Sequence, residues 1–148
     1  MAERVERRLM MEFLDLYYPE WVRLKNQRVG PIVPPGQPGQ VISFEEKYAK
    51  GFRRYADVIL VKGDDVIIVE FDVRASQEGP ASLEHYANLL PQTPELQDLT
   101  TKTISKLYVV AFSDPQIEQI CKNKGIEYKV FTPEWIKGYW SKRSPPTA

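Results

Sequence analysis

A pair of strongly β-forming runs separated by a tight turn constrains this chain more than any other feature. Residues 57–61 and 66–70 are rich in valine and isoleucine, which favour the extended backbone of a strand. The dipeptide Gly63-Asp64 between them is typical of a two-residue turn. Such a turn pairs Lys62 with Asp65 and fixes the register of the two strands. The sequence therefore predicts an antiparallel hairpin.

Acidic side chains stand on this hairpin among apolar ones. In the predicted register Asp57 lies directly opposite Glu70, and facing residues are ~5 Å apart at Cβ. Alternation along the strand places Asp72 and Arg74 on the same face as Glu70. Two carboxylates this close resist joint ionisation unless a cation lies between them. A divalent metal with oxygen ligands is the simplest such partner.

A second interpretation is that these charged residues only face water. It stays open for Asp72 and Arg74, because polar residues commonly occupy the solvent face of a strand. It is weaker for Glu70, which ends the apolar run Val66–Val69. That run is typical of a strand buried on both faces, where an acid needs a partner.

The composition is that of one globular domain, and we expect residues 1–148 to fold together. Apolar residues make up 43% of the chain and charged residues 27%, which is ordinary for a protein with a core. No apolar run approaches the ~20 residues of a membrane span, and the charged start does not resemble a signal peptide. We therefore expect a cytoplasmic protein without membrane contact.

Charge and metal-ligand counts narrow the range of partners. The 20 basic and 20 acidic residues give zero net charge, so contact with nucleic acid depends on local basic patches. The single cysteine and single histidine exclude a cysteine-rich zinc site and a two-histidine metal site. Carboxylate oxygens remain as the candidate metal ligands.

Periodicity and turn residues predict an α/β domain with a mixed central sheet flanked by helices. The sheet is expected to be antiparallel in the hairpin and joined by helical crossovers after it. A Pro/Gly-rich loop is expected at 31–39 and a disordered tail at 141–148. The expected helices are 2–17, 80–90, one after Pro115 and one carrying Trp135, and the expected strands are 21–25, the hairpin, 107–112 and 126–131.

The hairpin and the element order resemble the PD-(D/E)xK nuclease superfamily, which has the restriction-endonuclease-like fold. Its core has the order αβββαβ, and here a further C-terminal strand and helix follow. An acid opens the second strand of that core, and Glu-x-Lys or Asp-x-Lys closes the third. Asp57 matches the first acid and Glu70 the second. The resemblance implies a DNA endonuclease that hydrolyses phosphodiester bonds with Mg²⁺ or Mn²⁺ held by these two residues.

The lysine position of the family holds Asp72 in this chain. An aspartate cannot supply positive charge to a developing phosphorane, so an active enzyme would need this charge from another residue. Arg74, one strand repeat further on, is the first candidate, and Lys62 or Lys47 could also reach the site. Alternatively, Asp72 adds a metal ligand and Arg74 pairs with it in a structural ion pair, and a third option is that catalysis has been lost.

A glutamate from the first helix completes the metal site in several members of the family. By the same resemblance Glu12, at the edge of the apolar face of residues 2–17, is the candidate here, with Glu46 as the second.

Three interpretations of the whole chain stay open. In the first, the protein cleaves DNA with a bound metal. In the second, it is a catalytically inactive nuclease-fold module that binds nucleic acid or protein and can form a homodimer. Asp72 and the zero net charge favour this second interpretation. In the third, it is an unrelated α/β domain with surface acids, an interpretation that convergence of Asp57 and Glu70 would contradict.

Overall fold

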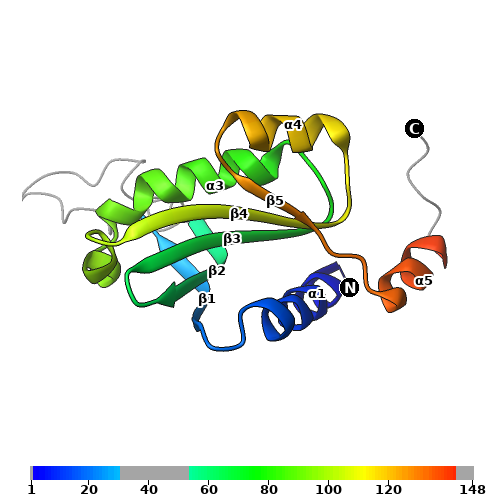
Figure 1. The fold of residues 1–148 in the computed structure, drawn as a ribbon, viewed down its shortest axis with the longest axis horizontal. Coiled ribbons are helices and arrows are strands. Elements are labelled where there is room, and N and C mark those ends of the chain that lie inside the picture. Colours follow the sequence, from blue (N-terminus) through cyan, green and yellow to red (C-terminus); the bar gives the residue numbers. More distant parts are fainter. Residues whose placement is uncertain (1, 31–53, 143–148) are drawn as a thin grey trace, which may run out of the picture.

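Figure 1 shows a computed structural model in which a twisted sheet lies between helices. The structure describes residues 2–30 and 54–142. The order of the elements confirms the predicted α/β class and the αβββαβ arrangement followed by a strand and a helix. The elements are α1 (Ala2–Tyr17), β1 (Val22–Val29), β2 (Arg54–Lys62), β3 (Asp65–Arg74), α3 (Glu78–Leu89), η1 (Leu90–Gln92), η2 (Pro94–Leu99), β4 (Thr103–Phe112), α4 (Pro115–Asn123), β5 (Glu127–Val130) and α5 (Glu134–Lys142).

The five strands form one mixed sheet in the order β1-β2-β3-β4-β5. The pairs β1–β2 and β2–β3 are antiparallel, whereas β3–β4 and β4–β5 are parallel and are joined through α3 and α4. Lys62 pairs with Asp65, and Gly63 in the turn has φ 58°, a conformation that suits glycine. The predicted hairpin register is therefore confirmed. Strand β1 is longer than predicted and reaches Val29.

The sheet buries a different apolar cluster on each face. On one face α1 contributes Met10, Phe13 and Leu14, which pack against alternate residues of β2, β3 and β4. On the other face α3 and α4 cover a second cluster that includes Leu83 and Ile117. Figure 1 shows α1 on the side of the sheet opposite α3 and α4. Two-sided burial explains why the central strands read as continuous apolar runs.

The helix after β4 begins as its sequence predicts. Asp114 accepts a hydrogen bond from the Gln116 amide at 2.9 Å, and Pro115 follows as the first helical residue. This cap satisfies an amide that has no partner within the helix. The turn after the helix contains Gly125, which has φ 69°.

Several predicted segments lie outside the described residues. They include the loop at 31–39 and the candidate side chains Glu46 and Lys47. Helix α5 continues to Lys142, so the first two residues of the predicted tail are helical. In the described part of the chain, no helix has both the length and the apolar character needed to cross a membrane.

Phe13→Ala should unfold the protein more easily, because Phe13 is 1% exposed and joins α1 to the sheet. Its ring centroid lies 5.7 Å from that of Phe71 and 5.5 Å from that of Phe131. We expect the free energy of unfolding to fall by about 3–5 kcal/mol. Leu16→Ala, three residues along the same helix and 64% exposed, should change it by less than about 0.5 kcal/mol. Urea denaturation of both variants measures the difference, and equal effects would contradict this packing.

Candidate functional site

Strand β2 leaves both of its hydrogen-bonded ladders at Asp57. The β1–β2 register passes from Lys25↔Val58 to Gln27↔Ala56 without pairing Asp57 to the residue opposite it, Asn26. The β2–β3 ladder ends at Val58↔Val69, one position before Asp57. The candidate acid predicted on β2 therefore lies at a gap in the middle of the antiparallel part of the sheet.

Side chains replace the missing ladder bonds at this gap. The Phe71 amide donates to Asp57 Oδ2 at 2.9 Å, and the Asp57 amide donates to Glu70 Oε1 at 3.1 Å. Each of the two acids thus accepts a hydrogen bond from the backbone of the opposite strand. This exchange satisfies the amides and fixes one oxygen of each carboxylate. The structure brings Asp57 and Glu70 together at the position that the hairpin register predicts.

Electrostatics at the pair favour a shared proton when no cation is present. Burial, together with the nearby charges of Asp57, Asp72 and Glu6, raises the pKa of Glu70 to about 9, although the hydrogen bond from the Asp57 amide opposes the rise. Burial also raises the pKa of Asp57, while hydrogen bonds from the Phe71 amide and from Glu70 oppose the rise. Half-buried carboxylates in mutual contact do not ionise together without a compensating charge.

Asp72 is held by a buried tyrosine on the neighbouring strand. The Tyr108 hydroxyl donates to Asp72 Oδ2 and accepts a hydrogen bond from the Ser76 amide at 3.1 Å. The ring packs against the first turn of α3, where a Cβ on Gly79 would lie 2.1 Å from Tyr108 Cζ. Burial raises the pKa of Asp72, and the hydrogen bond from Tyr108 opposes that rise. Asp72 therefore adds a third carboxyl group beside the pair.

A cavity of about 470 Å³ opens beside Asp57. It lies between α1, β1 and the gap in the sheet. Two basic side chains, Lys25 and Arg7, reach it together with Glu6 from α1. Among the described residues, its lining consists of Glu6, Arg7, Met10, Lys25, Asn26, Asp57 and Phe71. The space beside the acid is thus bounded by charges of both signs.

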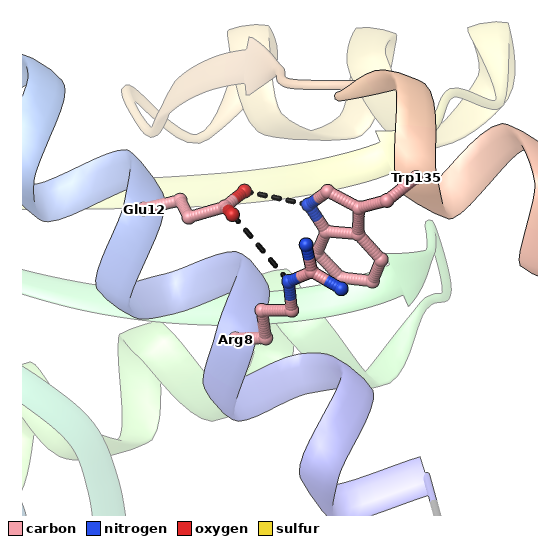
Figure 2. Close-up of polar contacts among 3 residues, drawn as sticks. All are labelled: Arg8, Glu12 and Trp135. Carbon is pink, nitrogen blue, oxygen red and sulfur yellow. Dashed lines mark hydrogen bonds and ion pairs between the residues drawn. The ribbon is translucent and has the colours of Figure 1, made fainter.

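The predicted helix glutamate, Glu12, points away from this cavity toward helix α5. Its Oε2 accepts a hydrogen bond from Trp135 Nε1 at 2.6 Å, and its Oε1 lies 3.4 Å from Arg8 Nε (Figure 2). The Arg8 guanidinium lies 4.0 Å from the centroid of the Trp135 ring. On α1 it is Glu6 that lines the cavity and acts electrostatically on Glu70.

Two of the basic residues predicted to replace the lysine, Arg74 and Lys62, do not line the cavity. Arg74 is exposed at the end of β3, opposite Phe112. Lys62 forms an ion pair with Glu20 at 3.6 Å, five residues or roughly 16 Å along β2 from Asp57. Lys25 was not assigned to the acidic site from the sequence, although its position on a predicted first strand next to the hairpin was a usable signal.

Within the described part of the chain, no three acidic, histidine or cysteine side chains converge into a set that could hold a metal ion by themselves. The Asp57–Glu70 pair supplies two carboxylates, one oxygen of each being fixed by a backbone amide. Magnesium commonly binds through one or two carboxylates and keeps several waters.

Comparisons with known proteins give matches in structure only. No family model matches the sequence, and no curated protein sequence matches it. Similar solved structures include a repair endonuclease from Pyrococcus abyssi, with 11% identity, a TM-score of 0.49, and coverage of 86% of this chain and 47% of that one. An EndoMS-dsDNA2 complex has 12% identity, a TM-score of 0.49 and coverage of 87% and 46%. A protein of unknown function has 12% identity, a TM-score of 0.47 and coverage of 91% and 61%. The chain thus spans about half the length of the first two.

Glu70→Gln should reduce the loss of stability that we expect at alkaline pH. The folded protein keeps a proton on Glu70 up to about pH 9, whereas the unfolded chain releases it near the ordinary value of 4.5. The stabilisation is complete below that lower value and is lost as the pH rises toward the higher one. Urea denaturation between about pH 5 and 9 with a chelator present should show a shallower decline in the variant.

Asp57 and Asp72 will leave the variant some pH dependence, since both pKa values are raised. Glu118→Gln, at an exposed position on α4, is the matched control and should keep the wild-type decline. Equal slopes for Glu70→Gln and wild type would contradict the raised pKa of Glu70.

Proposed function

We propose that the protein is a metal-dependent nuclease that hydrolyses phosphodiester bonds in DNA. The observation that carries this proposal is the Asp57–Glu70 pair, in which each carboxylate accepts an amide from the opposite strand beside a cavity that contains Lys25. The element order and the two acids of the PD-(D/E)xK pattern support it. Convergence of the two acids disfavours the interpretation that they are unrelated surface charges.

The residues present fit a hard divalent cation such as Mg²⁺ or Mn²⁺. One oxygen of Asp57 and one of Glu70 are fixed by amides, which leaves the second oxygen of each for a proton or a cation. Burial raises the pKa of both acids, so a positive charge placed between them would be stabilised. We propose that Asp57 and Glu70 hold the metal and that Glu6, in place of Glu12, is the helix carboxylate beside it.

A bound divalent cation would polarise the phosphate and lower the pKa of a water molecule. Asp57 and Glu70 would keep their fixed orientation throughout, because each is tied to the opposite strand. A water oxygen would form the new bond to phosphorus while the bond to the leaving oxygen breaks, with the water proton released to solvent and the leaving oxygen protonated from solvent. We propose that Lys25 stabilises the negative charge that develops on the phosphate oxygens. It is exposed and lines the cavity beside Asp57. Among the described residues, its ammonium group contacts only the weak acceptor Met11 Sδ, at 3.9 Å.

A nucleic-acid substrate is supported by an aromatic and a basic residue next to the gap. Tyr55 lies two residues before Asp57 on β2 and is 50% exposed. Its hydroxyl accepts a hydrogen bond from Arg28 Nε at 2.7 Å, and the guanidinium lies 5.3 Å from the ring centroid. Exposed aromatic rings flanked by arginine bind bases by stacking and backbones by charge. Arg7 in the cavity adds a second contact for phosphate.

A catalytically inactive binding module is the second candidate function. Asp72 favours it, because this residue is engaged by Tyr108 and supplies no positive charge. Such a module would keep the fold and the basic residues and would bind nucleic acid or protein without cleaving DNA. It could also form a homodimer. Metal binding with measurable cleavage separates the two candidates.

Asp57→Asn should weaken Mn²⁺ binding at least about tenfold. The asparagine amide can still accept the hydrogen bond from Phe71 through its carbonyl oxygen, so we expect the fold to persist while the ligand charge is lost. Calorimetric titration with Mn²⁺ measures the affinity, and cleavage of duplex, junction, flap and single-stranded DNA measures activity. Asp65→Asn, at the exposed first residue of β3 beside the hairpin turn, should bind Mn²⁺ as the wild type does. No binding by the wild type would refute the metal-dependent function.

Lys25→Ala should separate metal binding from cleavage. Removal of a positive charge near the carboxylates should leave Mn²⁺ affinity equal or higher, while cleavage falls on the order of 100-fold. Lys62→Ala, on the distant part of the hairpin, is the matched control and should retain wild-type cleavage. Unchanged cleavage by Lys25→Ala would show that another cation, such as Arg7 or Arg74, supplies the charge.

A further inference from the structure

Asn26 has a backbone conformation that is unusual inside a strand. Its φ is 49°, within the left-handed region that asparagine enters more readily than most residues other than glycine. It lies within β1, between Lys25 and Gln27, both of which pair regularly with β2. Among the described residues it is the single one other than glycine with a positive φ.

Both strands change face at this point. In β1, Leu24 and Val29 pack against the same apolar cluster although they are an odd number of positions apart. In β2, Ala56 and Ile59 belong to that cluster although they too are an odd number of positions apart. Residues at odd spacing in a regular strand point to opposite faces. In each strand the alternation of side chains between the two faces of the sheet therefore reverses once. The reversal lies in the segment that contains Asn26 in β1 and in the segment that contains Asp57 in β2.

This reversal in both strands explains how the Asp57 carboxylate can accept a hydrogen bond from a backbone amide. Amides of a strand lie in the plane of the sheet, whereas regular side chains stand away from it. Asp57 accepts the in-plane amide of Phe71, which a side chain on a regular strand does not do. Asp57 is also not paired with β1, and its own amide donates a hydrogen bond to the Glu70 carboxylate.

We propose that Asn26 is a positioning residue whose left-handed backbone keeps the β1–β2 ladder open opposite Asp57 and thereby aims the two carboxylates. The backbone conformation, and not the side-chain amide, performs this role. An extended residue at position 26 closes the ladder, returns Asp57 to the regular strand and breaks its contact with Phe71. The inference rests on the proposed function for its metal readout, whereas its structural readout is independent of any bound metal.

The test compares Asn26→Gly with Asn26→Val. Glycine adopts positive φ without strain, whereas a β-branched residue avoids it. Gln27→Val introduces the same side chain at the next, regularly paired position and controls for a general effect on β1. Each full-length variant is examined by calorimetric titration with Mn²⁺, by urea denaturation and by NMR measurement of contacts between residues 26 and 57.

Asn26→Gly should bind Mn²⁺ within about twofold of the wild type. Asn26→Val should stay folded, show new cross-strand contacts between residues 26 and 57, and bind Mn²⁺ at least tenfold more weakly. Equal loss of binding in both variants would assign the role to the side chain and overturn the proposal. The proposal would also be overturned if Asn26→Val bound Mn²⁺ as the wild type does and showed no contacts between residues 26 and 57.

Failure of the proposed function is distinguishable from failure of this inference. If the wild type binds no Mn²⁺, the metal-dependent function fails, while the NMR comparison still decides the role of Asn26. An Asn26→Val protein that does not fold is replaced by Asn26→Ala, which disfavours positive φ without a β-branch. A ladder that stays open in that variant overturns the inference.

Discussion

The rest of the site depends on two hydrogen bonds between β2 and β3: Asp57 accepts one from the Phe71 amide, and Glu70 accepts one from the Asp57 amide. A sheet cannot open in its interior without leaving amides unsatisfied, and each buried unsatisfied amide costs about 1–3 kcal/mol. Asp57 and Glu70 supply acceptors at the gap in place of carbonyl groups. The same contacts that repair the sheet therefore fix the directions of the two carboxylates, so the stability of the hairpin and the geometry of the site are linked.

The gap in the sheet at Asp57 also brings together carboxyl groups whose negative charge favours positive charge on the surrounding elements. Three carboxyl groups, those of Asp57, Glu70 and Asp72, lie near one another, and burial raises the pKa of each. Positive charge is available beside Asp57 from elements outside the hairpin. Arg7 and Lys25 come from α1 and β1, the two elements that line the cavity on its other sides. Helix α1 is in turn fixed by Phe13 against the sheet and by Glu12 against Trp135 of α5. In this arrangement Glu12 contributes by holding the helix that carries Glu6 and Arg7.

The sequence predicted those parts of the fold that depend on local chemistry. The glycine turn fixed the hairpin register, and a proline after an aspartate marked the start of α4, because each signal lies within a few residues of what it controls. The choice between Glu6 and Glu12 was different. Six residues of helix separate them by ~120° around the axis, and only the distant contact with Trp135 shows which side faces α5. The left-handed conformation of Asn26 was not predicted, since an asparagine permits a positive φ without requiring it.

The surroundings of Asp72 favour the proposed cation on β1 over a lysine at position 72 of β3. A lysine at residue 72 would place its ammonium group in the half-buried space that Tyr108 now enters, and would leave the hydroxyl of that tyrosine without its acceptor. The Tyr108 ring cannot easily withdraw, because it packs directly against Gly79 and its hydroxyl is also held by the Ser76 amide. Burial of a charge costs several kcal/mol unless it is paired and hydrogen-bonded. Lys25 avoids this cost because it is exposed on the strand next to the gap. A positive charge on β1 thus faces the same cavity as Asp57 without disturbing the packing between β4 and α3.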